Sequence, residues 1–280
     1  MQSARQRSGG RVMADIGIGI TGCGGRMGRM LLAEVLGSGG LMLAGGSEAA
    51  GSAVLGRELG ELAGSGPVGL AASADAGALF AAADVVIDFT VPAAAATHAE
   101  LAAKHGKALV LGTTGLDAAQ SKAVTAAAKR APIVWAPNMS PAVTLLQGLV
   151  QEAARRLGDD YDIEVLEMHH RHKVDAPSGT ALALGRAAAE GRAIDLAARS
   201  QRVRDGHTGP RKSGDIGFAT LRGGDVVGDH SVIFAGEGER LELTHRATSR
   251  RLFARGALRT AHWVVGKPPG LYGMKDVLGL

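Results

Sequence analysis

The run Ile16-Gly17-Ile18-Gly19-Ile20-Thr21-Gly22-Cys23-Gly24-Gly25-Arg26-Met27-Gly28 decides the fold. Its apolar opening is typical of a buried strand, and its glycines form a turn into a helix that we expect over residues 26–36. In such a strand–turn–helix the glycines let the backbone approach a pyrophosphate, which then lies on the helix N-terminus. The even spacing of Gly22, Gly25 and Gly28 is a variant of the usual dinucleotide fingerprint, and in a chain with 42 glycines the turn needs support from its context.

That support comes from the next predicted strand, residues 41–47, which ends at Glu48. An acid about twenty residues past the glycine turn is where a dinucleotide fold accepts hydrogen bonds from the adenosine ribose. The alternative is that Glu48 is a surface acid in a loop.

Strand and helix patterns then alternate, with strands expected over residues 84–90, 107–111 and 132–135 and helices over 92–105 and 117–130. The alternation predicts an α/β fold with a doubly wound parallel sheet, whose ligands bind at the carboxyl ends of the strands. We expect the loops at those ends to hold the nicotinamide half of a dinucleotide; they are residues 89–92, 112–115 and 136–140.

From Ser140 the pattern changes to an α+β second domain. Helices are expected over residues 141–157, from Ser178 onward, and over 249–265 with Ser249 or Thr248 as N-cap; strands are expected over 161–168, 217–221, 226–234 and 240–245. An open mixed sheet needs cover for its free face, and with 3% aromatic residues in the chain we expect another subunit to supply it.

A cluster of three histidines and a lysine, His169, His170, His172 and Lys173, lies where the strand 161–168 ends. The following Pro177-Ser178-Gly179-Thr180 begins a helix, and a helix N-terminus beside cationic and titratable side chains favours a carboxylate or phosphate. The cluster therefore indicates the anion-binding, proton-donating site of an enzyme. The alternative is a solvated basic loop with Ser178 as an N-cap.

Composition limits which protein classes, ligands and locations fit the chain. The 280 residues, 46% of them hydrophobic, suit two domains, and a net charge of +4 with few aromatic residues fits a small anionic ligand at least as well as nucleic acid. A single cysteine, Cys23, excludes an internal disulfide and a cysteine metal cluster, and fits a cytoplasmic location. No apolar run approaches the roughly 20 residues of a membrane span or forms a signal peptide, and residues 1–12 are expected to be a disordered extension before an ordered chain from about Met13.

Residues 164–181 and 221–230 resemble the signature of the 4-hydroxy-tetrahydrodipicolinate reductases, also called dihydrodipicolinate reductases, of lysine and diaminopimelate biosynthesis. The resemblance implies NAD(P)H-dependent reduction of 4-hydroxy-2,3,4,5-tetrahydrodipicolinate, a cyclic imine dicarboxylate, to tetrahydrodipicolinate. It implies that His169 donates the proton, that Lys173 assists it, that His170 contacts substrate, and that Gly179 and Thr180 bind a substrate carboxylate. No metal is expected, and we interpret Arg222 and His230 as structural or hinge residues.

The resemblance also implies the cofactor contacts. Cys23 replaces the small alanine often found in the turn, and we expect its thiol to be exposed near the phosphates. Ala49 stands where an arginine follows the acid in members that use NADPH well, so we expect NADH to serve at least as well as NADPH unless Arg26 or Arg57 replaces that arginine. The implied contacts are Gly22, Cys23, Gly24, Gly25, Arg26, Met27, Glu48, Gly112, Thr113, Thr114, Ala136, Pro137, Asn138 and Met139.

At the level of domains, the resemblance implies a discontinuous dinucleotide-binding domain, residues 13–139 with 249–280, and a substrate-binding and oligomerisation domain, residues 140–248. It implies a homotetramer that assembles through the second-domain sheet.

Two alternatives stay open from the residues alone. A related amino-acid or aldehyde dehydrogenase would not explain the His-His-Arg-His-Lys run at residues 169–173. A redox-sensing regulator that binds NAD(H) and nucleic acid would need a recognition helix or basic arm, for which the segment before Met13 is the candidate. Oxidation of reduced nicotinamide in the presence of dihydrodipicolinate discriminates between them.

Overall fold

The structure, a computed structural model, describes residues 15–280, so the expected N-terminal extension and Met13 lie outside it. By packing, the described chain forms two compact units. The first comprises the chain up to Ile133 with Ala261–Leu271, and the second comprises Val134–Thr260 with Tyr272–Leu280. The domain boundaries expected from the sequence, after residues 139 and 248, stay predictions.

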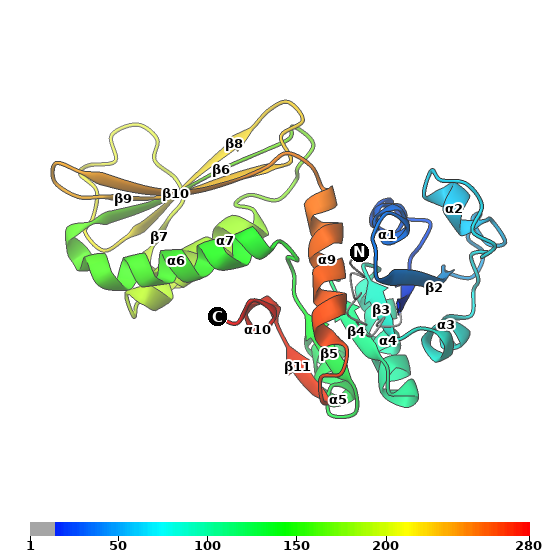
Figure 1. The fold of residues 1–280 in the computed structure, drawn as a ribbon. Coiled ribbons are helices and arrows are strands. Elements are labelled where there is room, and N and C mark those ends of the chain that lie inside the picture. The colour runs from blue at the N-terminus through cyan, green and yellow to red at the C-terminus, as the bar shows by residue number, and fades with distance from the viewer. Residues whose placement is uncertain (1–14) are drawn as a thin grey trace, which may run out of the picture. The chain divides into compact units, whose positions relative to one another are not determined.

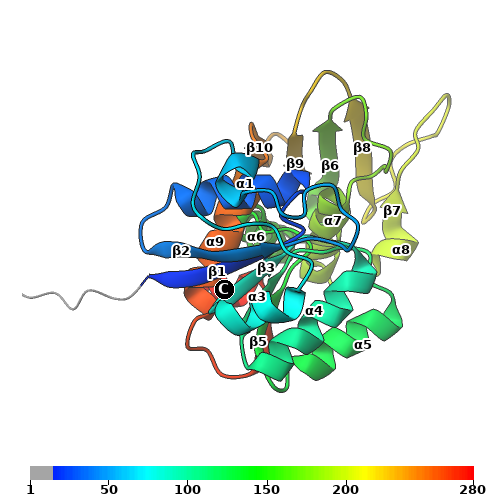
Figure 2. The ribbon, with the colours of Figure 1, turned by 90° about the vertical axis from the view of Figure 1, so that its right-hand side faces the viewer.

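The first unit is built on a six-stranded sheet in the order β11-β5-β4-β3-β1-β2. Strand β1 pairs in parallel with β2 and with β3, and β3 with β4, so the strand order reverses between β1 and β3. Figure 2 shows helix α1 on one side of these strands and α3 and α4 on the other, which confirms the doubly wound parallel fold. The strands are β1 (Ile16–Thr21), β2 (Leu41–Ser47), β3 (Val85–Asp88), β4 (Ala108–Leu111), β5 (Pro132–Trp135) and β11 (Gly270–Tyr272).

The central strands form because their residues are largely apolar on both faces, and β3 and β4 are buried throughout. The helices carry the expected end signals. Helix α4 begins at a proline and ends at Gly106 in the left-handed conformation, and α5 begins with a capping box of Asp117 and Gln120. Sequence periodicity missed the short elements α2 and α3, because a single turn or two carries little of it. The helices are α1 (Arg26–Leu36), α2 (Leu59–Leu62), α3 (Ala76–Ala82), α4 (Pro92–His105) and α5 (Ala118–Ala127).

The second unit is built on a five-stranded mixed sheet in the order β10-β9-β6-β8-β7. Strand β6 pairs in parallel with β8 and antiparallel with β9, and β9 pairs antiparallel with β10. Helices α6 (Pro141–Leu157) and α7 (Gly179–Gly191) lie together on one face of the sheet (Figure 1). The strands are β6 (Asp162–His169), β7 (Ser200–Gln201), β8 (Ile216–Arg222), β9 (Gly228–Ala235) and β10 (Arg240–Ala247).

Side-chain alternation divides this sheet into two faces. Val165, Phe218 and Phe234 are buried with α6 and α7 in the core. The opposite face carries half-buried Leu166 and Ile233, and in Figure 1 neither α6 nor α7 covers it.

The remaining described elements are short, apart from α9. They are the 3₁₀ turn Gly158–Asp160 and the helices α8 (Leu196–Arg199), α9 (Arg251–Val264) and α10 (Met274–Leu278). Within residues 15–280, no helix combines the length and the apolar character that crossing a membrane requires.

Candidate active site

The alternation of β6 places Glu167 and His169 on the helix-covered face, beyond the core residues Ile163 and Val165. The two side chains, two residues apart, meet: His169 Nδ1 lies 2.5 Å from Glu167 Oε2. Glu167 is only 1% exposed and His169 is 8% exposed. The carboxylate therefore accepts a hydrogen bond from Nδ1–H, and Nε2 is the nitrogen left for chemistry.

Glu167 is the centre of a buried hydrogen-bond network. Both of its oxygens accept from the Arg222 guanidinium, at 2.8 and 2.9 Å, and Oε1 also accepts from the Ser178 backbone N–H at 3.1 Å. Burial opposes ionisation, but the hydrogen bonds from Arg222 and His169 outweigh it and hold the pKa of Glu167 below its ordinary value. Glu167 is therefore a carboxylate at neutral pH and connects the strand to the start of helix α7.

His230 lies against the same cluster from β9, opposite Glu167 in the antiparallel register. Its ring centroid is 5.0 Å from that of His169, edge to face, and its Nε2 lies 3.0 Å from Ser178 Oγ. Burial lowers the pKa of His230 to about 4, so the ring is neutral at physiological pH. Gly228 leaves space beside His169, because a Cβ there would lie 3.0 Å from His169 Nε2.

The start of helix α7 has the free backbone donors that the predicted anion site requires. The Ser178 side chain caps the helix by accepting from the Ala181 N–H at 3.1 Å. Within the described chain, the N–H groups of Gly179 and Thr180 are left without a backbone or cap partner, as is usual for the first turn. The Thr180 hydroxyl accepts from Asn138 Nδ2 at 3.2 Å.

The cationic loop after β6 is held against residues 223–226. The His170 N–H donates to the Val226 carbonyl at 2.7 Å. Lys173 Nζ pairs with the exposed carboxylate of Asp175 at 2.8 Å, and His170 Nε2 lies 3.1 Å from Arg250 Nη2. Burial, followed by the positive charges around it, lowers the pKa of His170, so this ring is a neutral hydrogen-bonding group rather than a cation.

A cavity of about 450 Å³ lies in the first unit, beside the carboxyl ends of β1, β2 and β3. Gly22, Gly25 and Glu48 line it, together with the segment Phe89 to Val91 and His98. Glu48 Oε2 accepts from the Gly24 N–H at 3.0 Å, which holds the acid beside the glycine turn.

The glycine turn fits a dinucleotide. A Cβ at Gly28 would lie 2.1 Å from the Gly22 carbonyl oxygen, so only glycine permits this close packing of turn and helix. Helix α1 has no side-chain cap at Gly25, which leaves its N-terminus available for a phosphate. A cavity walled by this turn and by an acid after the second strand therefore suits the pyrophosphate and adenosine ribose of a dinucleotide.

Cys23 corrects one expectation. The thiol is fully buried rather than exposed near the phosphates, and burial raises its pKa to about 11. The reason is that the turn directs Cys23 inward, against the position of Gly46 on β2.

The loop after β4 is tied to that after β3 through a buried carboxylate, Asp88. Its Oδ1 accepts from Thr113 Oγ1 at 3.0 Å and from the Thr90 N–H at 2.8 Å, and its Oδ2 lies 2.5 Å from His98 Nδ1. Thr113 therefore contributes its side chain to loop structure, and Thr114 next to it is exposed. Arg26 is exposed on α1, Met27 is half-buried, and Ala136, Pro137 and Met139 are grouped with the second unit.

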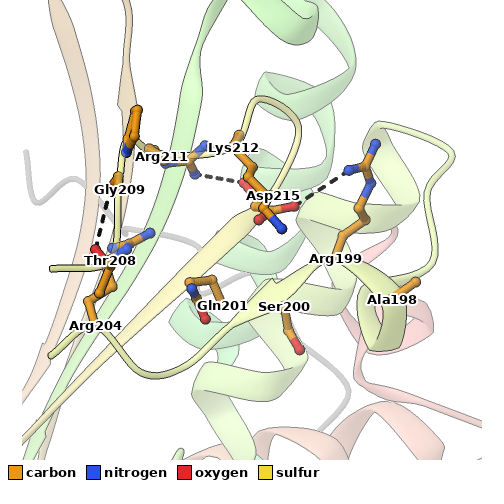
Figure 3. Close-up of a pocket in the computed structure, with 11 residues that line it drawn as sticks. Ala198, Arg199, Ser200, Gln201, Arg204, Thr208, Gly209, Arg211, Lys212 and Asp215 are labelled. Atoms are coloured by element: carbon orange, nitrogen blue, oxygen red, sulfur yellow. Dashed lines mark hydrogen bonds and ion pairs between the residues drawn. The ribbon is translucent and has the colours of Figure 1, made fainter.

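A second cavity, of about 320 Å³, lies in the second unit between residues 198 and 215 (Figure 3). Its arginines are paired with carboxylates: Arg199 with Asp215, and Arg204 and Arg211 with Glu164. These ion pairs neutralise the guanidinium groups, so this cavity is a less favourable anion site than the start of α7.

Residues 16–139 match the family model of the dihydrodipicolinate reductase N-terminus, and residues 142–278 match that of the C-terminus. The chain is 57% identical over 268 residues to the 4-hydroxy-tetrahydrodipicolinate reductase of Parvibaculum lavamentivorans, covering 95% of this chain and 99% of that protein. It is 56% identical over 266 residues to the one of Brucella abortus, with 95% and 99% covered.

Among solved structures, a dipicolinate-bound dihydrodipicolinate reductase from Paenisporosarcina sp. TG-14 shares the fold. Its TM-score is 0.73 at 24% identity, with 94% of this chain and 99% of that chain covered. An amine dehydrogenase from Mycobacterium smegmatis is more distant, with a TM-score of 0.62 at 14% identity and coverage of 92% and 94%.

The sequence pattern predicted His169, His170, Lys173, Gly179 and Thr180 as site residues, which stay predictions, and it gave no role to Glu167. The strand period was a usable signal, because residues two apart on a strand share a face. It treated Arg222 and His230 as structural or hinge residues, and the structure places both side chains in contact with the cluster around His169. Those contacts depend on strand pairings that no local pattern reveals.

Proposed function

The chain belongs to the dihydrodipicolinate reductase family and catalyses the reductive step of lysine and diaminopimelate biosynthesis, and from that premise we propose how its residues divide the work. The reaction reduces 4-hydroxy-tetrahydrodipicolinate with NAD(P)H and a proton, and yields tetrahydrodipicolinate, the oxidised cofactor and water. The observation that carries the assignment is the His169–Glu167 pair beside the start of helix α7.

His169 donates the proton. Its Nδ1–H donates to Glu167, which fixes the orientation of the ring and leaves Nε2 as the nitrogen that can pass a proton to the substrate. Arg222 holds that carboxylate in place and keeps it ionised. The neutral ring of His230 packs against His169 without adding a competing charge.

Gly179 and Thr180 bind a substrate carboxylate. Two backbone N–H groups and the helix dipole favour an anion here, and the Thr180 hydroxyl lies beside them. Lys173 supplies a cation whose partner, Asp175, is exposed, so a substrate carboxylate can share or replace that pair. His170 helps to orient the substrate from the same loop.

Glu48 and the glycine turn hold the adenosine ribose and pyrophosphate of the cofactor, which supplies the hydride when bound. The remaining cofactor residues proposed from the resemblance are the segment of residues 22–27, the loop of residues 112–114 and the segment of residues 136–139. Ala49 lines the cavity next to Glu48 and gives a 2′-phosphate no cation, which supports use of NADH at least as good as that of NADPH.

The face of the second sheet that α6 and α7 leave uncovered supports a homotetramer assembled through it. This face carries Leu166, Met168 and Ile233, all half-buried, and Leu221, which is 48% exposed. An apolar sheet face of this kind is usually covered by another subunit. We place the enzyme in the cytoplasm, where a single buried thiol stays reduced.

A coupled assay tests the function. The preceding synthase generates the substrate in the cuvette, and loss of reduced nicotinamide absorbance reports turnover by the full chain. A fall in turnover of on the order of 10²-fold or more when His169 is replaced by Ala supports the assignment, and unchanged turnover removes His169 from the reaction.

A further inference from the structure

The side-chain amide of Asn138 has a defined orientation. Asn138 lies between β5 and α6, and the Ser140 backbone N–H donates to its Oδ1 at 2.8 Å. Because an N–H can only donate, the amide oxygen must face Ser140, and the amide NH₂ must then face Thr180 Oγ1, 3.2 Å away.

This orientation decides what the Thr180 hydroxyl can do. An amide NH₂ has no acceptor, so Thr180 Oγ1 accepts from Asn138 and its single proton is free for another partner. Thr180 lies in the first turn of α7, where its own N–H and that of Gly179 are also without partners among the described residues. Three donors are thus available at one place, and a carboxylate offers two oxygens that only accept.

We infer that Asn138 is a positioning residue that makes Thr180 an obligate hydrogen-bond donor, and thereby selects a carboxylate over a carboxamide at the start of helix α7. The inference deepens the proposed function and rests on it, since it concerns the same carboxylate site. A carboxamide would bring its own NH₂ donors toward these donors and lose at least one bond. The resemblance assigns Asn138 to the cofactor, whereas this contact gives it a role in substrate selection.

The test is direct binding of 2,6-pyridinedicarboxylate, by calorimetry with saturating NADH, to the full-length protein. Four proteins are compared: wild type, Thr180→Val, Asn138→Asp and the double variant. Thr180→Val removes the hydroxyl and should weaken binding by roughly 10- to 150-fold, the value of one charge-assisted hydrogen bond. Asn138→Asp replaces the NH₂ with an acceptor, so the Thr180 hydroxyl turns toward the introduced carboxylate, and binding should weaken at least as much.

The double variant decides the matter. If Asn138 acts through Thr180, the double variant binds the diacid no more weakly than the single variant with the lower affinity, because the contribution of the hydroxyl is already lost in that single variant. If the loss of diacid affinity in the double variant equals the product of the two single losses, Asn138→Asp acts by charge repulsion alone, and the inference is overturned. Asn138→Ala, which adds no charge, should weaken diacid binding less than Asn138→Asp, and its loss should likewise not multiply with that of Thr180→Val. Thr180→Ser should retain the wild-type affinity for the diacid.

Two further measurements separate the possible failures. The monoamide, 6-carbamoylpyridine-2-carboxylate, should bind wild type more weakly than the diacid, and this difference should shrink in Asn138→Asp; an unchanged difference contradicts the inference. The NADH affinity, measured by fluorescence without the diacid, should stay within about threefold of wild type in Thr180→Val, and a loss of NADH affinity in the Asn138 variants that exceeds their loss of diacid affinity overturns the role of Asn138 in substrate selection. If the wild-type protein oxidises no NADH in the presence of substrate, the proposed function is refuted. If the enzyme is active but the two losses of diacid affinity multiply, only the role of Asn138 is refuted.

Discussion

Replacing Glu167 with Gln removes one negative charge from the buried network and nearly preserves its shape. In the wild type this carboxylate accepts from Arg222 through both oxygens and from Ser178, and it bonds His169 Nδ1. A glutamine has one acceptor oxygen and directs NH₂ protons at groups that are themselves donors. The variant therefore loses the charge-assisted hydrogen bond that holds His169 in its orientation.

The magnitude follows from one charge-assisted hydrogen bond, worth roughly 1.5–3 kcal/mol, which corresponds to a fall in kcat of about 10- to 150-fold. The KM for substrate should change less, because the helix start at Gly179 remains. The NADH affinity should be unchanged, because the cofactor cavity lies in the other unit.

The assay is steady-state kinetics from pH 6 to 9, with circular dichroism to confirm folding. Glu164→Gln is the matched control, since it makes the same change on the same strand, where the carboxylate pairs with Arg204 and Arg211. A folded Glu167→Gln enzyme with kcat within about twofold of the control refutes the view that this carboxylate supports proton donation.

The remaining predictions concern the proton donor, the cofactor and pH. His169→Ala should lower kcat by on the order of 10²-fold or more with cofactor affinity nearly intact, and a change confined to KM would assign His169 to binding instead. NADH should give a kcat/KM at least equal to that of NADPH at one ionic strength, with Ala49→Arg improving NADPH; a wild-type preference for NADPH above about tenfold contradicts this. Burial lowers the pKa of His230 from 6.5 to about 4, so between these pH values the folded state binds fewer protons than the unfolded state. The free energy of unfolding therefore falls as the pH drops from 6.5 to about 4, by up to about 3 kcal/mol. Denaturant unfolding between pH 7 and 4.5 should show a shallower loss for His230→Asn, and parallel curves would contradict the neutral buried ring.

The sequence by itself determined the longer helices and strands and the residue types of the candidate site. The run from Ile16 to Gly28 specified strand, turn and helix, because buried β-branched residues, glycines and a helical pattern are local signals, and the bounds of α1 and β2 matched the expectation. It also identified the His-Lys cluster and the helix start at Ser178, since both are contiguous in the chain. Local signals are reliable where the interacting groups are a few residues apart.

Only the tertiary structure decided which groups meet. Glu167 and Arg222 are 55 positions apart, and they pair because β6 and β8 are parallel neighbours in register. His230 reaches Ser178 because β9 pairs with the other edge of β6. Cys23 is buried because the turn packs on β2. Such contacts depend on strand order, and hence on the burial of whole faces, which no window of sequence contains.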